Sequence, residues 1–121
     1  MQKGMKEQIR EQICSDVVSK EINALHQNRH FRDSNGYIEG RSYFYEGIDP
    51  QSLIEQYHGT GEIRLSKAGN WINKEFIIMD RDIGVHIDDS TNVATITNSF
   101  AIHYSKRGAH IIPSRPRRRS L

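Results

Sequence analysis

The chain has 121 residues, of which 36% are apolar and 26% are charged, and this composition is typical of a single folded domain. Its one cysteine, Cys14, excludes an intrachain disulfide and a zinc site built from several cysteines. No apolar run is as long as a membrane span, and the polar N-terminus has no signal-peptide core, so export would need another segment or system.

A helical pattern comes first along the chain. Apolar residues recur at steps of three to five from Met5 to Leu25, with charged residues between them. This spacing is close to the period of an amphipathic helix, and it predicts one long helix over about 5–26. The next segment, 28–40, contains a cluster of turn-forming residues and is expected to be a loop.

A short strand and a second helix are predicted next. The aromatic residues of segment 41–46 favour a strand. Asp49 is a good N-cap, and Pro50 fits the first helical position, so a helix is expected over about 50–58. Gly59 is suited to end that helix, because glycine readily takes the left-handed conformation found after a helix.

After Gly59 the apolar period changes to two, which is typical of strands. We expect strands over 62–66, 71–79, 83–87, 93–97, 100–105 and 109–113. The predicted fold class is therefore α+β, with N-terminal helices packed on a twisted antiparallel sheet of about four to six strands. Residues 1–113 form one domain in this prediction, with the sheet over about 61–113, and 114–121 form a basic disordered tail.

The net charge of +2 hides an uneven distribution along the chain. From Ser99 onward there are six Lys and Arg residues and no acid, whereas the remainder carries eleven Lys and Arg against fifteen acids. A basic end on an acidic body indicates a polyanionic partner, with nucleic acid the first choice. A solvated charged tail is the alternative for segment 115–119.

The predicted last hairpin is dense in groups that can transfer protons. A two-residue turn at Arg107-Gly108 would place Ser105 opposite His110, with His103 on the same face, whereas a three-residue turn would place Tyr104 opposite His110. Metal-independent RNA cleavage needs a base for the ribose 2′-OH, an acid for the departing 5′-oxygen and a cation for the phosphate. Histidine can supply both proton transfers, and Lys or Arg can supply the charge.

Other candidates are scattered along the chain. Arg29 and His30 lie at a helix-to-loop junction, where side chains can point into a cleft. Thr60 lies between two glycines, and this segment could either bind a phosphate or simply end the helix. Trp71 suits packing or base stacking. His26, His58 and His86 are interpreted as surface residues. No glycine-rich phosphate loop, paired-histidine zinc helix or calcium loop is present, so no metal and no cofactor are expected.

An ordered series of short motifs resembles one known family. The motifs are Asn28-Arg29-His30, Gly40-Arg41-Ser42-Tyr43, Asp49-Pro50-Gln51, Gly59-Thr60-Gly61-Glu62-Ile63, Gly69-Asn70-Trp71, Asn73-Lys74-Glu75, Ile83-Gly84-Val85, Phe100-Ala101-Ile102-His103-Tyr104-Ser105-Lys106 and His110-Ile111-Ile112-Pro113. Together, over about 22–113, they resemble the bacterial polymorphic toxin type-fifty domain. The resemblance implies a ribonuclease toxin of the barnase/EndoU/colicin/RelE-like fold, paired with an immunity protein and carried by a larger secreted or phage-associated protein. The site residues that it implies are His30, Ser42, Thr60, Glu75, His103, Tyr104, Ser105, Lys106 and His110.

The sequence is therefore interpreted as an endoribonuclease toxin that leaves a 2′,3′-cyclic phosphate and acts in the cytoplasm of the producing or target bacterium. His103 and His30 are the expected acid/base pair and Lys106 the phosphate clamp, and Thr60, Ser105 and His110 would orient them or bind phosphate. The expected contacts to a tRNA or another structured RNA are Arg29, Ser42, Trp71, Tyr104 and Arg107. A non-catalytic nucleic-acid-binding module is one alternative. A phage structural domain that docks a partner through strand 43–45 is another, and no membrane partner is expected.

Overall fold

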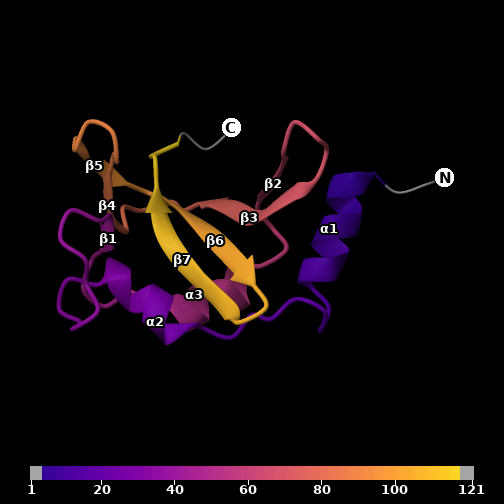
Figure 1. Ribbon diagram of the computed structural model, residues 1–121, viewed down its shortest axis with the longest axis horizontal. Helices are drawn as coiled ribbons and strands as arrows, with labels where there is room; N and C mark the ends of the chain where they lie inside the picture. The colour runs from indigo at the N-terminus through magenta and orange to yellow at the C-terminus, as the bar shows by residue number, and fades with distance from the viewer. Residues whose placement is uncertain (1–3, 118–121) are drawn as a thin grey trace.

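The structure, a computed structural model, describes residues 4–117, in which the helices lie in the first half of the chain and all strands but the short β1 follow them (Figure 1). The elements are α1 (Met5–Ile13), α2 (Ala24–Gln27), the 3-10 helix η1 (Asn28–His30), β1 (Tyr43–Phe44), α3 (Pro50–Tyr57), β2 (Glu62–Leu65), β3 (Trp71–Ile78), β4 (Gly84–Ile87), β5 (Ala94–Thr97), β6 (Ser99–Ser105) and β7 (Gly108–Ser114). This arrangement confirms the predicted α+β class. None of the described helices is long and apolar enough to cross a membrane.

The strands form two antiparallel sheets where the sequence predicted one. One sheet has the order β2-β3-β6-β7 and the other has the order β1-β4-β5. β5 ends at Thr97 and β6 begins at Ser99, so the chain passes from one sheet to the other at Asn98. The Asn98 side chain donates to the Met79 carbonyl and accepts from the Arg117 amide, and these bonds fix the bend. The three-stranded sheet therefore lies at one end of the molecule and α1 near the other (Figure 1).

The main core lies on one face of the four-stranded sheet. Ile13 of α1 and Ile54 of α3 are fully buried there against Ile63, Ile102 and Ile111. Burial of such side chains contributes roughly 1.5–3 kcal/mol each. α3 has the predicted start and nearly the predicted length, because the Asp49 side chain accepts a hydrogen bond from the Ser52 amide. The opposite face of the sheet is left free of this core.

The predicted long helix over 5–26 is wrong beyond its first half. α1 ends at Ile13, and a turn segment leads to the short helix α2. The ammonium of Lys20 donates to the carbonyls of Ile13, Ser15 and Val18, at 2.7, 2.6 and 2.6 Å. These bonds satisfy carbonyls that would otherwise need further helical turns. Val17 is 83% exposed, so its apolar character reflects no buried helix face.

The last hairpin has neither of the two predicted registers. Its turn is Lys106-Arg107, so Ser105 pairs with Gly108 and His103 pairs directly with His110. Gly108 has a φ of 117°, and a Cβ there would meet the Glu21 carbonyl oxygen at 2.6 Å. The amide of Ala109 donates to that same carbonyl oxygen. The segment around Ile22 therefore fixes the register by docking on β7, a contact that no local pattern reveals.

The predicted disordered tail over 114–121 is only partly tested, and its first residues are ordered. Ser114 belongs to β7. Arg115 bonds Asp88 at 2.9 Å, and Arg117 bonds Glu62 at 2.7 Å. Residues 118–121 lie outside the described part of the chain.

Candidate functional site

The free face of the four-stranded sheet carries two adjacent histidines. Side chains alternate along β6 and β7, so Tyr104 and Ile111 are buried in the core while His103 and His110 lie on the other face. The ring centroids of His103 and His110 are 5.0 Å apart, with an interplanar angle of 48°. The hairpin therefore presents two half-buried imidazoles side by side.

α2 and η1 bring two more histidines to this face. The His26 ring meets His110 edge-on at 5.2 Å, and the His30 ring lies parallel to His110 at 6.4 Å. Buried Gln27 holds these helices against β7, since its amide donates to the Ile111 carbonyl at 2.9 Å and accepts from the Ile111 amide at 2.7 Å. We call His26, His30, His103 and His110 the histidine cluster.

The tautomer of His30 is set by its surroundings. Its Nδ1 lies 2.8 Å from the carbonyl oxygen of Ser42, and a carbonyl oxygen can only accept a hydrogen bond. Nδ1 must therefore carry a proton, and in the neutral ring Nε2 keeps its lone pair. Ser42 is itself fixed, because its hydroxyl accepts from the Ile87 amide at 2.8 Å. The strands thus hold His30 in the form that a general base requires.

Burial, with repulsion from neighbouring rings and cations, keeps three of the four histidines in the neutral state. Burial, followed by repulsion from His110, lowers the pKa of His103 to about 3. Burial, followed by repulsion from His26, lowers the pKa of His110 to about 4. The pKa of His30 is also lowered, again chiefly by burial. All three rings are therefore neutral near pH 7, and a bound anion would favour protonation of one of them.

Two adjoining cavities border the histidine cluster. One, of about 480 Å³, is lined by Lys74 and His103, and the other, of about 220 Å³, is lined by Arg29, His30 and His110. Lys74 of β3 is the cross-strand partner of His103, so an ammonium lies beside that imidazole. His86 lines both cavities, and its Nδ1 is buried with no hydrogen-bond partner among the described residues.

Three arginines also line the larger cavity, and each of them is paired with a carboxylate. Arg64 and Arg117 both contact Glu62, at 2.6 and 2.7 Å, and Arg115 contacts Asp88 at 2.9 Å. Hydrogen bonds from Ser90, Thr91 and Arg115 keep the pKa of Asp88 well below its usual range. The face thus combines neutral imidazoles with cations at its rim, an arrangement that can accept a phosphate and exchange protons with it.

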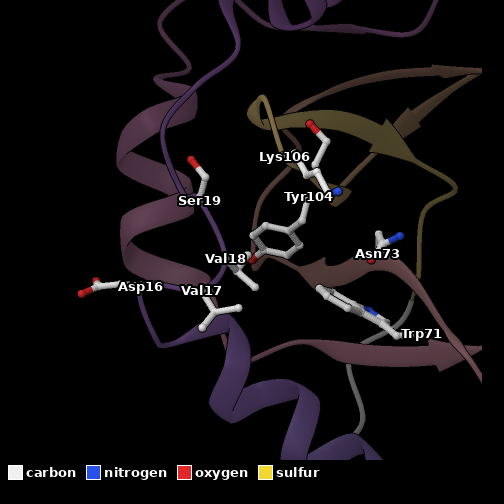
Figure 2. A pocket seen from close by; sticks show the side chains of 9 residues that line it. Asp16, Val17, Val18, Ser19, Trp71, Asn73, Tyr104 and Lys106 are labelled. Atoms are coloured by element: carbon white, nitrogen blue, oxygen red, sulfur yellow. The ribbon is translucent and has the colours of Figure 1, made fainter.

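Several of the predicted site residues lie on the other side of the hairpin. Trp71, Tyr104, Ser105 and Lys106 line a separate cavity of about 590 Å³, whose other wall is formed by residues 16–19. We call this cavity the rear pocket (Figure 2). Arg107 is exposed in the turn beside it. The structure therefore separates Lys106 from the histidines that it was expected to assist.

Thr60 and Glu75 belong to a third place in the fold. The Thr60 hydroxyl donates to the Tyr57 carbonyl at 2.6 Å, which ends α3. The Glu75 carboxylate is fully buried and accepts from the Gly59 amide at 3.1 Å, the Gly61 amide at 2.7 Å and the Tyr104 hydroxyl at 2.8 Å. The backbone N–H groups that a phosphate might have used therefore already bind a carboxylate of the chain itself.

Sequence reasoning missed three members of this site. His26 was interpreted as a surface residue, although it lies one helical turn before His30, and that spacing was the available signal. Lys74 lies two residues before Phe76 on the same face of β3, and strand alternation could have assigned it to the face of His103 only once the register was known. No local signal distinguished His86.

Within residues 4–117, no group of three or more His, Cys, Asp and Glu side chains is placed to hold a metal ion. The sequence model of a family described as bacterial toxin 50 matches residues 22–113, which include every member of the histidine cluster together with Lys74 and His86. No curated protein matches the sequence.

Proposed function

Because the chain belongs to the bacterial toxin 50 family, we propose that its toxic activity is metal-independent cleavage of RNA at the histidine cluster. The observation that carries the proposal is the packing of three imidazoles, those of His26, His30 and His103, around His110, with an ammonium beside His103. A cationic face with neutral proton-transfer groups suits a phosphodiester, whose backbone is anionic and whose cleavage needs two proton transfers.

The proposed reaction is an internal transfer at phosphorus. A base removes the proton of the ribose 2′-OH, and the 2′-oxygen forms a bond to the adjacent phosphorus. The bond from phosphorus to the 5′-oxygen then breaks, and an acid gives that oxygen a proton. The products are a 2′,3′-cyclic phosphate and a free 5′-hydroxyl. No redox step and no external nucleophile are needed.

The arrangement suggests a role for each group. His30 suits the base, because its Nδ1–H is bonded to the Ser42 carbonyl and Nε2 retains a lone pair. His103 suits the acid once the negative charge of a bound phosphate has raised its low pKa, so that the ring takes up a proton from solvent. Lys74 replaces Lys106 as the proposed phosphate clamp, since it is the direct neighbour of His103. His110 lies between the acid and the base and would position both.

The family gives this activity a biological setting. A toxin domain needs a cognate immunity protein to protect the producing cell, and we propose such a partner here. Delivery as part of a larger secreted or phage-associated protein would bring the domain into the cytoplasm of a target bacterium. A tRNA or another structured RNA is the proposed substrate.

The test is incubation of the purified protein with total tRNA and a short end-labelled RNA in EDTA, followed by a denaturing gel. We expect cleavage that survives the chelator, with products that end in a 2′,3′-cyclic phosphate. The His103→Ala variant should lose the activity. His58→Gln is the matched control, because His58 caps α3 through the Ile54 carbonyl, away from the histidine cluster.

Two results would overturn the proposal. The first is a wild-type protein that leaves both RNAs intact although circular dichroism confirms that it is folded. The proposed function would then be a binding module that uses Arg115 and Arg117 at the rim of the larger cavity. If His103→Ala cleaved as fast as His58→Gln, the reaction would not occur at the histidine cluster.

A further inference from the structure

The rear pocket combines an aromatic floor with an exposed apolar wall. The ring of Tyr104 lies at its centre, with Trp71 on one side and Val17 and Val18 on the other, while the Asp16 carboxylate points outward (Figure 2). The Trp71 and Tyr104 ring centroids are 5.7 Å apart. The cavity measures about 590 Å³, inside the range of about 300–1,000 Å³ typical of small-molecule sites.

The two aromatic side chains have no polar group to offer a ligand. The Trp71 Nε1–H donates to the Lys74 carbonyl at 2.9 Å, and the Tyr104 hydroxyl donates to Glu75 at 2.8 Å. These bonds also fix the rings in place. Tyr104 is only 6% exposed, so what remains for a ligand is chiefly the ring surface of half-buried Trp71, which favours a flat aromatic partner over an extended peptide.

Polar groups stand at the mouth of the rear pocket. Asn73 is exposed with a left-handed backbone (φ 62°), and its amide can both donate and accept, as the edge of a nucleobase requires. Lys106 lies at the tip of the last hairpin and adds a cation. Ring surface suits the face of a nucleobase, the amide suits its edge, and the cation suits the phosphate of the same nucleotide.

The opposite wall is pre-formed. The three hydrogen bonds of the Lys20 ammonium to the carbonyls of Ile13, Ser15 and Val18 hold the segment between α1 and α2. Val17 is 83% exposed on this segment, so its side chain is accessible from the rear pocket. A stacked base would cover it.

We propose that the rear pocket is a second contact site for the RNA, in which an unpaired nucleobase stacks on Trp71 and its phosphate meets Lys106. This inference rests on the proposed function, because it takes the cleaved RNA as the ligand. His103 and Lys106 are three residues apart, a span of about 10 Å at the strand rise. One RNA strand can therefore pass from the histidine cluster around the end of the sheet into the rear pocket. The substrate class that follows is RNA with a single-stranded segment at the cleavage site.

Trp71 makes the inference directly measurable, because it is the only tryptophan in the chain. The probe is a hexamer of 2′-O-methyladenosine, which has no free 2′-OH and cannot be cleaved. Titration of the full chain should change the Trp71 emission, with the same midpoint as the fluorescence polarisation of a labelled hexamer. His103→Ala should retain the change, since it leaves the rear pocket intact.

A pair of lysine variants supplies the matched control. Lys106→Glu should weaken binding about ten-fold or more, through loss of the cation and repulsion of the phosphate. Lys67→Glu reverses the charge of another exposed hairpin-turn lysine, outside the rear pocket, and should weaken binding by no more than about two-fold. Both lysines are exposed, so both variants should fold.

The outcomes separate this inference from the proposed function. Cleavage by the wild-type protein with no change in Trp71 emission would overturn the rear-pocket site and leave the ribonuclease standing. Equal weakening by Lys106→Glu and Lys67→Glu, or no binding of the hexamer, would also overturn it, and the pocket would then be free for a protein partner. A specific emission change without any cleavage would support the RNA site and reject the cleavage chemistry.

Discussion

The two faces of β6 differ in whether their polar side chains are hydrogen-bonded within the protein. On the core face, the Tyr104 hydroxyl and the Glu75 carboxylate are bonded to each other, and the carboxylate also accepts two backbone N–H groups. On the other face, His103 packs against His110 at 5.0 Å, and the nearby His86 leaves a buried Nδ1 without a partner among the described residues. One face satisfies its polar groups, and the other keeps them available.

This difference separates structural residues from chemical ones. A carboxylate that accepts three hydrogen bonds in the core has a structural role, because the loss of any of these bonds would leave a buried polar group without a partner. Half-buried imidazoles that resist protonation make the fold less stable as the pH falls, and such an arrangement is typical of a functional site. Residues 103 and 104 are neighbours in the chain, yet they belong to these two different classes.

The largest expected effect is on catalysis, from a mutation on the face that carries the histidine cluster. His103→Ala should lower kcat/KM for RNA cleavage by about a thousand-fold, the usual contribution of a general acid. The same change should leave the free energy of unfolding at pH 7 nearly unaltered, because the neutral, half-buried His103 ring lies on the face of the sheet opposite the core. Initial rates and urea denaturation measure the two effects. A loss of stability as large as the loss of activity would place His103 among the structural residues.

A mutation on the core face of the sheet should mainly lower the stability of the fold. Glu75→Gln puts an N–H₂ group where the carboxylate accepts hydrogen bonds, so at least one buried donor loses its partner. We expect the free energy of unfolding to fall by about 3 kcal/mol. Thermal or urea unfolding tests this, with Glu55→Gln as the control, because Glu55 is an exposed residue of α3. An unchanged midpoint would contradict the bracing role.

The pH dependence of cleavage should reveal the neutral cluster. In the free protein the acid must be a protonated histidine, and the pKa values of His103 and His110 are about 3 and 4. The protonated fraction then falls about ten-fold per pH unit above these values, so kcat/KM should rise steadily from pH 8 to pH 5. A bell-shaped profile centred on pH 7 would rule out the proposed pair.

Acid should also weaken the fold before the carboxylates titrate. The folded-state pKa values of His103 and His110 are lowered to about 3 and 4, below the 6.5 of an unperturbed histidine. Below about pH 6.5 the unfolded chain therefore binds more protons than the folded one, and stability declines as pH falls. With allowance for partial solvent screening, we expect a loss on the order of 2 kcal/mol between pH 7 and pH 5.

Urea midpoints at the two pH values measure this loss. The double variant His103→Gln, His110→Gln removes the two titrating groups and should flatten the dependence. If the double variant lost as much stability as the wild-type protein, the depressed pKa values would belong to other groups.

Local patterns predicted the elements well where the chain itself fixes them. α3 follows from the Asp49 cap and Pro50, and the hairpin of β2 and β3 follows from alternation around Gly69. The prediction of one long helix was wrong because apolar periodicity does not reveal the Lys20 ammonium, which bonds the carbonyl of Ile13 at the end of α1 and the carbonyls of Ser15 and Val18 beyond it. His30, His103 and His110 were predicted to carry chemistry, but their neighbours His26 and Lys74 were not.

The sequence by itself determined the α+β class, and it placed His103 and His110 on a basic hairpin. Only the tertiary structure decided that they pair directly, that His26 and His30 join them, and that Lys106 faces another pocket. The reason is distance along the chain. Gln27 meets Ile111 across 84 residues, and Ile22 docks beside Ala109 to set the register. Contacts of this kind depend on how whole segments pack, which no local period or spacing encodes.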